Sequence, residues 1–216
     1  MSKAKPLIII VVAIALAAGA AVFLSRGSSE AAKTGDNLTP APGGGRAQGA
    51  ANAPVTLVEY ADYECPMCKL VYPMVNELVK RYPDKVRFEY HYFPLIQIHP
   101  HAMEAALAAE AAGEQGKYWE MHDLLFDRQE QWHATQSVES LFITYAAQLG
   151  LNTKQFADSM HSRDAQSRIL KDVERARDAK VEGTPTFFMN NQRLEPLPKN
   201  VNDLVRAVDD RLRAAQ

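Results

Sequence analysis

Hydrophobic and polar residues follow two different periods along much of the chain, and these periods predict where strands and helices lie. Apolar residues recur every three or four positions after residue 66, which predicts a helix over about 66–81. Segment 55–61 predicts a strand that ends just before this helix. The alternation of charged and apolar residues over 85–93 predicts a second strand. Because a helix connects them, the two strands are expected to pair in parallel.

Helical patterns dominate the next part of the chain. The predicted helices cover about 101–114, 117–128, 138–149, 152–160 and 164–179. Closely spaced charges in the last of these predict a mostly exposed helix. A short apolar strand at 186–189 follows, with a turn at Asn190-Asn191 whose residues tolerate positive φ. A returning strand at 192–194 and a final amphipathic helix around 204–212 complete the pattern.

The predicted order is therefore β-α-β, an all-helical stretch, then β-β-α. This is the α/β class, with a small sheet divided by a helical insertion over about 98–182. The predicted domain covers 54–216, a length that is typical of one domain with its own core. The helical insertion accounts for roughly half of it.

The first residues have a composition unlike that of a folded domain. Lys3 and Lys5 precede an uncharged apolar run over 6–24. As a helix with about 1.5 Å per residue, this run spans roughly 28 Å, close to the thickness of a bilayer core. Residues 1–24 are either a cleaved signal peptide or a retained signal anchor. The anchor is favoured because a signal-peptide core is normally about 7–15 residues long. Both alternatives export the rest of the chain.

Residues 25–53 are predicted to be a flexible linker. They contain no aromatic residue, one large aliphatic residue, Leu38, and the run Gly43-Gly44-Gly45. Over the whole chain, 24 Lys and Arg balance 26 Asp and Glu. This balance does not indicate a nucleic-acid-binding protein.

The chain has only two cysteines, Cys65 and Cys68, and they flank Pro66 and Met67 at the start of the predicted helix. Two cysteines at this spacing indicate thiol–disulfide chemistry, because helix N-terminal N–H groups stabilise a thiolate. A zinc site would need a second pair of ligands. His99 and His101, two residues apart at a helix start, are more typical of capping or surface groups, so no metal or cofactor is predicted.

Three strings in the chain together resemble one family. They are Val58–Cys68 (VEYADYECPMC), His99–Ala102 (HPHA) and Gly183–Phe188 (GTPTFF). With the order of elements, they resemble the DsbA-like thiol–disulfide oxidoreductases of the bacterial cell envelope. The resemblance covers nearly all of 53–216 and implies a thioredoxin fold with an inserted helical subdomain.

The expected positions of the cysteines give them different roles. Cys65 would lie at or beside the helix N-cap, with Pro66 at the first helical position. Its sulfur would then lie near the N–H groups of Met67 and Cys68, which favours the thiolate. We therefore expect Cys65 to be the exposed, attacked sulfur and Cys68 the buried resolving thiol. Met67 offers the Cys65 sulfur no strong hydrogen bond, so the sequence leaves the oxidising strength open.

The resemblance also implies roles for residues outside the motif. Glu59 occupies the position of a buried acid that would exchange a proton with Cys68, although a solvent-facing strand carboxylate is the alternative. Thr184-Pro185 resembles the cis-proline loop of the family, which would bind a substrate strand through the Thr184 backbone. The alternative is a trans-proline at a strand start. Pro66 and Met67 are expected to contribute to the same substrate-binding surface.

The predicted function is an exported protein disulfide oxidase that acts through a Cys65–Cys68 disulfide. The resemblance implies exported substrates that contain cysteines, and a quinone-linked membrane partner of the DsbB or vitamin-K-epoxide-reductase type that reoxidises the enzyme. The expected location is the periplasmic face of the inner membrane. A disulfide isomerase or reductase on the same scaffold, or a non-catalytic tethered chaperone, is the alternative.

Overall fold

The computed structural model describes residues 40–41 and 44–214. Within them, one six-stranded sheet has the order β1-β2-β4-β3-β5-β6. The strands are β1 (Pro40–Ala41), β2 (Gly44–Gln48), β3 (Val55–Ala61), β4 (Val86–Tyr92), β5 (Thr186–Met189) and β6 (Gln192–Arg193). The α/β thioredoxin-like fold expected from the sequence is confirmed.

The parallel pair β3 and β4 forms the centre of the sheet. Its register runs from Val55 opposite Val86 to Ala61 opposite Tyr92. This is the predicted arrangement of two strands joined by a crossover helix. On the other side of β3, strand β5 pairs antiparallel and continues into β6 through Asn190 and Asn191. The φ angles of these two residues are 48° and 64°, so the predicted turn is confirmed.

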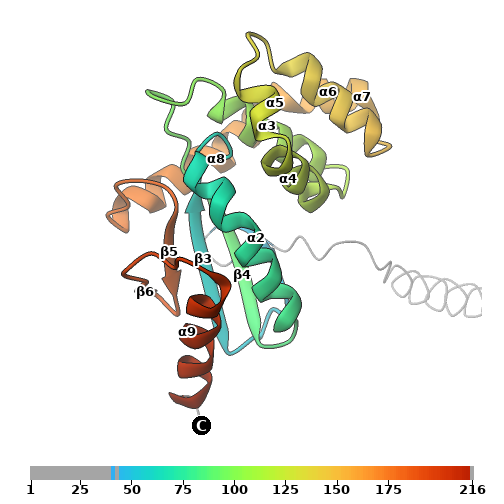
Figure 1. The fold of residues 1–216 in the computed structure, drawn as a ribbon. Helices are drawn as coiled ribbons and strands as arrows, with labels where there is room; N and C mark the ends of the chain where they lie inside the picture. The colour runs from blue at the N-terminus through green and yellow to red at the C-terminus, as the bar shows by residue number, and fades with distance from the viewer. Residues whose placement is uncertain (1–39, 42–43, 215–216) are drawn as a thin grey trace, which may run out of the picture. The chain divides into compact units, whose positions relative to one another are not determined.

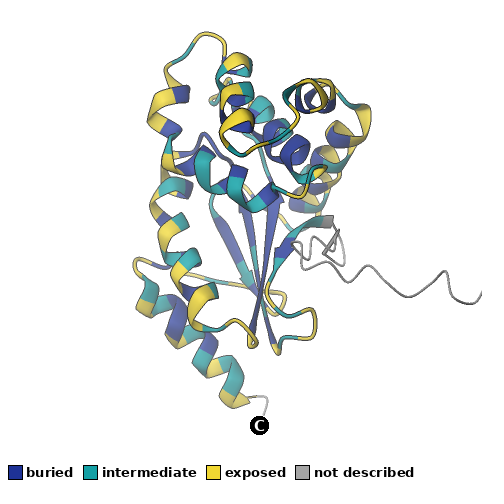
Figure 2. Ribbon diagram, turned by 90° about the vertical axis from the view of Figure 1, so that its right-hand side faces the viewer, coloured by how far each residue is buried: buried dark blue, intermediate teal, exposed yellow. Residues whose placement is uncertain are grey.

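Helices cover both faces of the sheet (Figure 1). They are α2 (Pro66–Arg81), α3 (Ala102–Gly113), α4 (Tyr118–Asp127), α5 (Gln129–His133), α6 (Glu139–Gln148), α7 (Thr153–Met160), α8 (Arg163–Asp178) and α9 (Val201–Ala214). Helices α2 and α9 contact each other and pack on one face, whereas α8 packs against β4 and β2 on the other. Figure 2 shows the central strands largely buried between these layers; these are β3, β4 and β5, whereas both residues of β6 are exposed.

The alternation of side chains along β3 divides them between two clusters. Val55, Leu57 and Ala61 belong to the main core under α2 and α9. Tyr60 joins a smaller cluster beneath α8. Because strand side chains alternate between faces, Glu59 lies on the same face as Leu57 and Ala61, which is the face beneath α2.

The inserted helices pack closely around α3. Its buried face consists mostly of alanine: Ala102, Ala105, Ala106, Ala108, Ala109, Ala111 and Ala112. Small side chains allow neighbouring helices to approach, and α4, α6, α7 and α8 all contact α3.

Helix α8 is mostly exposed, as predicted, but it also carries a buried stripe that the prediction missed. Ala165, Ile169, Asp172 and Ala176 are buried at helical spacing. The helix therefore covers the second face of the sheet as well as bordering the insertion. Two alanines and an aspartate in the stripe give little hydrophobic signal, which is why the sequence pattern did not indicate this contact.

The predicted linker over 25–53 extends too far. Strand β2, at 44–48, pairs antiparallel with β4 and belongs to the folded domain. Ala47 is buried, and the Arg46 side chain forms an ion pair with Glu110 of α3. A strand with the sequence GGRAQ lacks apolar alternation, so neighbouring elements determine its structure.

The predicted membrane span over 6–24 and most of the predicted linker lie outside the described residues. Of the helices within 40–41 and 44–214, none has the length and apolar character needed to cross a bilayer.

Candidate redox-active site

The cysteine motif lies where β3 passes into α2. Cys65 is the N-cap residue of α2, with φ −71° and ψ 122°, and Pro66 takes the first helical position. Proline is favoured there because its missing N–H has no partner inside the helix. The predicted strand-to-helix placement is confirmed.

Both cysteines are free thiols in the structure, and they differ in burial. Cys65 retains 6% of its accessible surface, whereas Cys68, one turn into the helix, retains none. Cys65 is therefore the more accessible sulfur, although it is less exposed than the sequence suggests. Met67, between them, is 46% exposed at the surface of the helix.

The environment of Cys65 stabilises its thiolate. A hydrogen bond from the Cys68 thiol is the largest influence that lowers the pKa of Cys65, which falls from 9.0 to about 5 although burial opposes the change. The Thr184 side chain and the backbone N–H groups of Cys68 and Met67 act in the same direction. At pH 7, a thiol with this pKa is about 99% thiolate, against about 3% for free cysteine.

Cys68 has the opposite electrostatic character. Burial raises the pKa of Cys68 well above its ordinary value, and the nearby Cys65 and Glu59 raise it further. Cys68 therefore holds its proton strongly, and its thiolate must gain a proton whenever it leaves a disulfide.

Glu59 is buried beneath the motif rather than facing solvent. It retains 3% of its accessible surface and lies between Tyr90 of β4 and Phe187 of β5 in the sheet register. Burial and the nearby Cys65 raise the pKa of Glu59 from 4.5 to about 8. The Glu59 carboxyl is therefore protonated in most molecules near neutral pH. It is also close enough to Cys68 to raise the pKa of that thiol.

The Thr184-Pro185 loop faces the motif from the start of β5. The peptide bond between these residues is cis, as predicted. The Cys65 thiol donates a hydrogen bond of 3.4 Å to the Thr184 carbonyl oxygen. A backbone carbonyl thus lies next to the Cys65 sulfur. A second cis bond, Glu195-Pro196, was not expected from the sequence.

An apolar groove of about 760 Å³ begins beside the motif. Met67, Leu70 and Met74 of α2 line one side, and residues 196–201 line the other. Leu70 is 64% exposed, so a large apolar side chain stands at the surface of α2 one turn after Met67. Surfaces of this kind bind apolar segments of other molecules.

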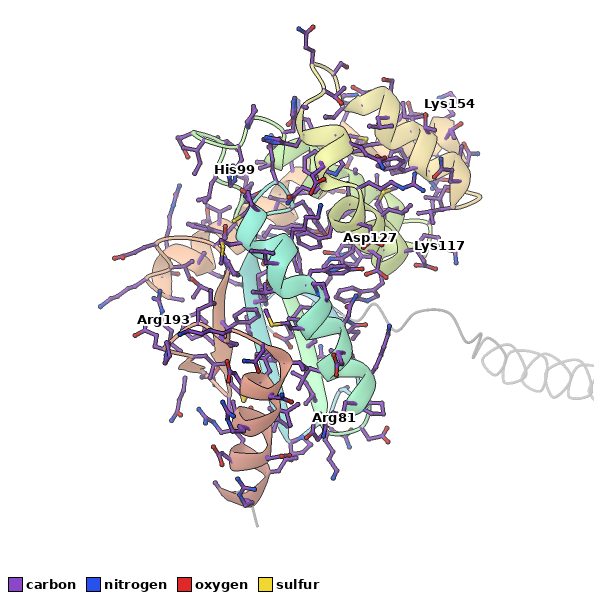
Figure 3. All side chains as sticks on the ribbon, viewed as in Figure 1. Arg81, His99, Lys117, Asp127, Lys154 and Arg193 are labelled. Atoms are coloured by element: carbon purple, nitrogen blue, oxygen red, sulfur yellow. The ribbon has the colours of Figure 1, made fainter. Side chains whose placement is uncertain are left out.

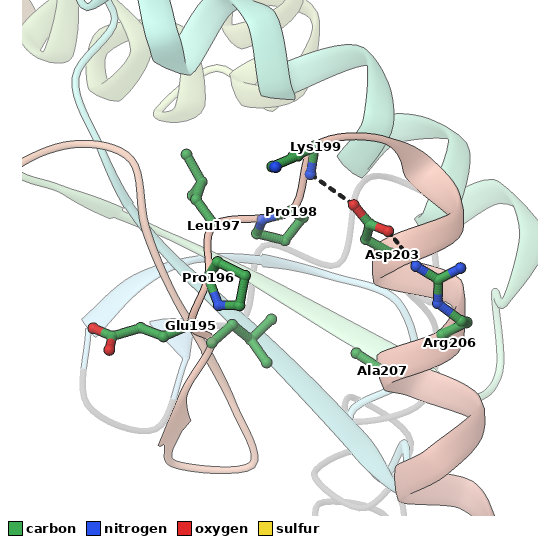
Figure 4. A pocket seen from close by; sticks show the side chains of 9 residues that line it. Glu195, Pro196, Leu197, Pro198, Lys199, Asp203, Arg206 and Ala207 are labelled. Atoms are coloured by element: carbon green, nitrogen blue, oxygen red, sulfur yellow. Dashed lines mark hydrogen bonds and ion pairs between the residues drawn. The ribbon is translucent and has the colours of Figure 1, made fainter.

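The segment that forms the second wall of the groove is held by the start of α9 (Figure 4). Asp203 accepts hydrogen bonds from the Lys199 backbone N–H at 2.9 Å and from Arg206. Asn200 in turn accepts a bond from the Asp203 N–H at 3.2 Å. These bonds form a reciprocal helix cap, and the cap holds the groove wall in place.

Several site residues were missed by the sequence patterns. The buried carboxylates Asp62 and Glu64 precede Cys65, and Gln129 of the unpredicted helix α5 donates hydrogen bonds to the backbone carbonyls of Tyr63 and Cys65. The Asp62 side chain accepts the Glu64 N–H, a bond typical of an Asx turn. The local string Asp-Tyr-Glu could have indicated this turn, but nothing local indicates the contact with Gln129.

His99 is neither a capping nor a surface group, which corrects the prediction. It is partly buried, and its Nδ1 lies 2.7 Å from Asp62. His101 occupies the N-cap position of α3, and its backbone N–H donates to Glu64. Among the residues that the structure describes, no three His, Cys, Asp or Glu side chains gather in a way that could bind a metal.

A comparison with known proteins places the chain in a family. A family model described as thioredoxin matches residues 42–210. The structure of a thioredoxin-like oxidoreductase from Silicibacter pomeroyi DSS-3 is 28% identical, with a TM-score of 0.66 over 80% of this chain and 94% of that one. DsbA2 from Pseudomonas aeruginosa is 26% identical, with a TM-score of 0.61 over 78% and 94%. The chain belongs to the DsbA-like, thioredoxin-fold family of thiol–disulfide oxidoreductases.

A curated relative has a different overall function. The Na⁺/H⁺ antiporter NhaA 3 from Salinispora tropica is 43% identical over 161 residues, which cover 74% of this chain and 24% of the antiporter. The chain thus spans about a quarter of that protein's length, and the similarity concerns one part of it.

Proposed function

We propose that this chain is an exported dithiol oxidase that transfers a Cys65–Cys68 disulfide to cysteine pairs of substrate proteins. The observation that carries the proposal is the opposite character of the two thiols. The pKa of Cys65 is lowered to about 5, mainly by the Cys68 thiol, whereas burial raises the pKa of Cys68. A stabilised Cys65 thiolate favours the reduced enzyme, so the disulfide form is a strong electron acceptor.

In the proposed reaction, a substrate thiolate attacks the Cys65 sulfur of the disulfide. The Cys65–Cys68 bond breaks, its electron pair goes to Cys68, and the protonated form of Glu59 gives its proton to the Cys68 thiolate. A second substrate thiolate then attacks the substrate sulfur of the mixed disulfide, and Cys65 leaves as a stable thiolate. The substrate loses two electrons, and the enzyme gains them.

Substrate binding would use the surfaces on either side of Cys65. The Thr184 carbonyl, which accepts a hydrogen bond from the Cys65 thiol, would accept a backbone hydrogen bond from an extended substrate segment. The apolar groove beside Met67 and Leu70 would hold apolar side chains of the same segment. Unfolded chains expose such side chains, so these features support a substrate that has not yet completed folding.

Membrane attachment and reoxidation complete the proposal. The apolar run over 6–24 would keep the enzyme on the outer face of the inner membrane. A quinone-linked membrane protein would accept the two electrons of the reduced Cys65–Cys68 pair and return the enzyme to its disulfide form.

The reduction potential of the full-length protein tests the direction of electron flow. Equilibration with glutathione buffers is expected to give a value between about −120 mV and about −270 mV, the potentials of a strong oxidase and of thioredoxin. The reason is that the pKa of Cys65 lies below that of a thioredoxin thiol, near 7. A potential at or below that of thioredoxin would contradict the oxidase role and favour a reductase.

A charged residue in place of Leu70 tests whether the apolar groove binds the substrate protein. Leu70→Asp is expected to raise KM for an unfolded protein substrate about tenfold or more, because burying a leucine contributes about 1.5–3 kcal/mol. Leu170→Asp is the matched control, since Leu170 is 45% exposed on α8, away from the groove. Oxidation of a small dithiol should be unchanged in both variants. Equal KM values in the two variants would exclude the groove from substrate binding.

A further inference from the structure

We propose that Asp62 is a positioning residue for the redox reaction, and that its carboxylate fixes the backbone beside both cysteines by anchoring it to the segment that leads from β4 to α3. This role rests on the proposed disulfide exchange at Cys65. It means that contacts from residues 95–133 help to set the reactivity of the Cys65 sulfur.

The Asp62 backbone contacts both cysteines. Its carbonyl oxygen accepts a hydrogen bond of 3.1 Å from the Cys65 N–H. Burial raises the pKa of Cys68, and a hydrogen bond from the Asp62 N–H to the Cys68 sulfur opposes this effect. Any displacement of Asp62 would therefore change the surroundings of both sulfurs.

The Asp62 side chain is buried and fully engaged. It retains 2% of its accessible surface and accepts three hydrogen bonds. The donors are the Glu64 N–H at 2.8 Å, the Leu95 N–H at 2.8 Å and His99 Nδ1 at 2.7 Å. Leu95 and His99 belong to the segment between β4 and α3, and Figure 3 shows His99 beside the start of α2. The carboxylate thus links the turn before Cys65 to a segment more than thirty residues away, since His99 follows Asp62 by 37 positions.

A second group of bonds holds the same turn from the helical side. Glu64 accepts the His101 N–H at 2.6 Å and lies 2.9 Å from His133 Nδ1. Gln129 donates to the carbonyl oxygens of Tyr63 at 2.6 Å and Cys65 at 3.0 Å. The turn before Cys65 is therefore held at every residue by partners from 95–133, and its position depends on these contacts.

An amide cannot replace the Asp62 carboxylate in this arrangement. Asparagine has one acceptor oxygen, and its NH₂ group carries two donors. In Asp62→Asn that group takes the place of one oxygen and faces either the Glu64 N–H or the donors of Leu95 and His99, so at least one of the three bonds that hold the turn is lost. The change is nearly isosteric, so the variant alters the bonding without creating a cavity.

Asp172 provides a matched control. It is 1% exposed and, like Asp62, accepts backbone N–H groups and a histidine Nδ1: Gly45 N–H at 3.1 Å, Tyr92 N–H at 3.2 Å and His91 Nδ1 at 3.2 Å. It lies on α8, on the opposite face of the sheet from α2. Asp172→Asn therefore disrupts a similar buried carboxylate without touching the motif.

The test is a titration of the Cys65 thiolate, followed by alkylation rate against pH in the full-length reduced protein. We expect Asp62→Asn to raise the pKa of Cys65 by about one unit, because the N–H donors at the N-terminus of α2 are no longer held at the sulfur. The equilibrium constant for oxidising glutathione should fall about tenfold in parallel. Asp172→Asn is expected to change neither quantity, even where it lowers stability.

Two outcomes would overturn the proposal. A lower pKa of Cys65 in Asp62→Asn would mean that Asp62 acts only as a nearby negative charge. No change in pKa, with both variants destabilised alike, would mean that Asp62 is only structural. If Asp62→Asn does not fold, His99→Gln removes one of the two donors to Asp62 Oδ2. It is expected to raise the pKa of Cys65 in the same direction, with an ionisation constant about threefold smaller. The titration does not depend on the direction of electron flow, so its result is separate from that of the oxidase test.

Discussion

Replacing Cys65 with serine is expected to reduce disulfide transfer to the level of the uncatalysed reaction. The serine hydroxyl forms no disulfide with Cys68 and is not ionised near neutral pH, whereas the pKa of Cys65 is lowered to about 5 by the Cys68 thiol. The measurement is the rate of oxidation of a dithiol peptide by the full-length protein. Substantial activity in Cys65→Ser would contradict the proposed reaction and support a non-catalytic chaperone.

Cys68→Ser provides the contrasting variant. Cys65 keeps its place at the N-cap, and a serine hydroxyl still donates a hydrogen bond to its sulfur. Without a resolving thiol, this variant is expected to accumulate mixed disulfides with substrates, visible on a non-reducing gel. Cys68→Ala lacks the donor, so the pKa of Cys65 should be higher in Cys68→Ala than in Cys68→Ser. Equal values would mean that the Cys68 thiol does not stabilise the Cys65 thiolate.

Replacing Glu59 with glutamine is expected to make the reduced protein more stable and less active. Burial raises the pKa of Glu59 from 4.5 to about 8, so the folded state favours the protonated carboxyl. The contribution of Glu59 to the stability of the wild-type protein is therefore fully present below pH 4.5 and is lost as the pH rises from 4.5 to 8. Glutamine resembles the protonated acid and removes this loss. The gain in the free energy of unfolding is about 3 kcal/mol at pH 7 and close to zero below pH 4.5.

The same variant is expected to slow disulfide transfer about 100-fold at pH 7, because a general acid typically contributes a factor of this size. Denaturant unfolding at two pH values and the pH profile of the exchange rate measure the two effects. A stability gain without loss of rate would leave Glu59 buried but without a role in proton transfer.

Glu110→Gln is a control for which the change in the free energy of unfolding is expected to have the opposite sign. Glu110 is also buried, but Arg46 and Arg168 pair with it, and the Arg46 bond is the largest of the influences that lower its pKa against burial. Because its pKa is lowered, Glu110 contributes stability to the folded protein at pH values above the ordinary pKa of glutamate. This stability is lost as the pH falls through the pKa that Glu110 has in the folded state. Removing the charge leaves two arginines partly unpaired, so Glu110→Gln should destabilise the protein by about 3 kcal/mol at pH 7.

Much of the redox centre could be predicted from local sequence. Cys65, Pro66 and Cys68 follow a strand pattern and begin a helix pattern, and both patterns depend on neighbours a few residues away. The cis bond at Pro185 was expected because Thr184-Pro185 resembles a known loop. For the cysteine motif the evidence lies within a short string, so its position in the fold follows from local propensity and spacing, whereas the cis bond was implied by the resemblance alone.

Other features depend on long-range contacts. The burial of Glu59 requires α2 to cover β3, and strand β2 forms because β4 offers it a pairing edge. Asp62 and Gln129 meet the motif only because residues 95–133 fold back onto the turn before Cys65. The sequence by itself thus determined which two sulfurs form the motif and where their helix begins. Only the tertiary structure decided their environment, because the pKa values of Cys65, Cys68 and Glu59 depend on burial and on partners distant in the chain.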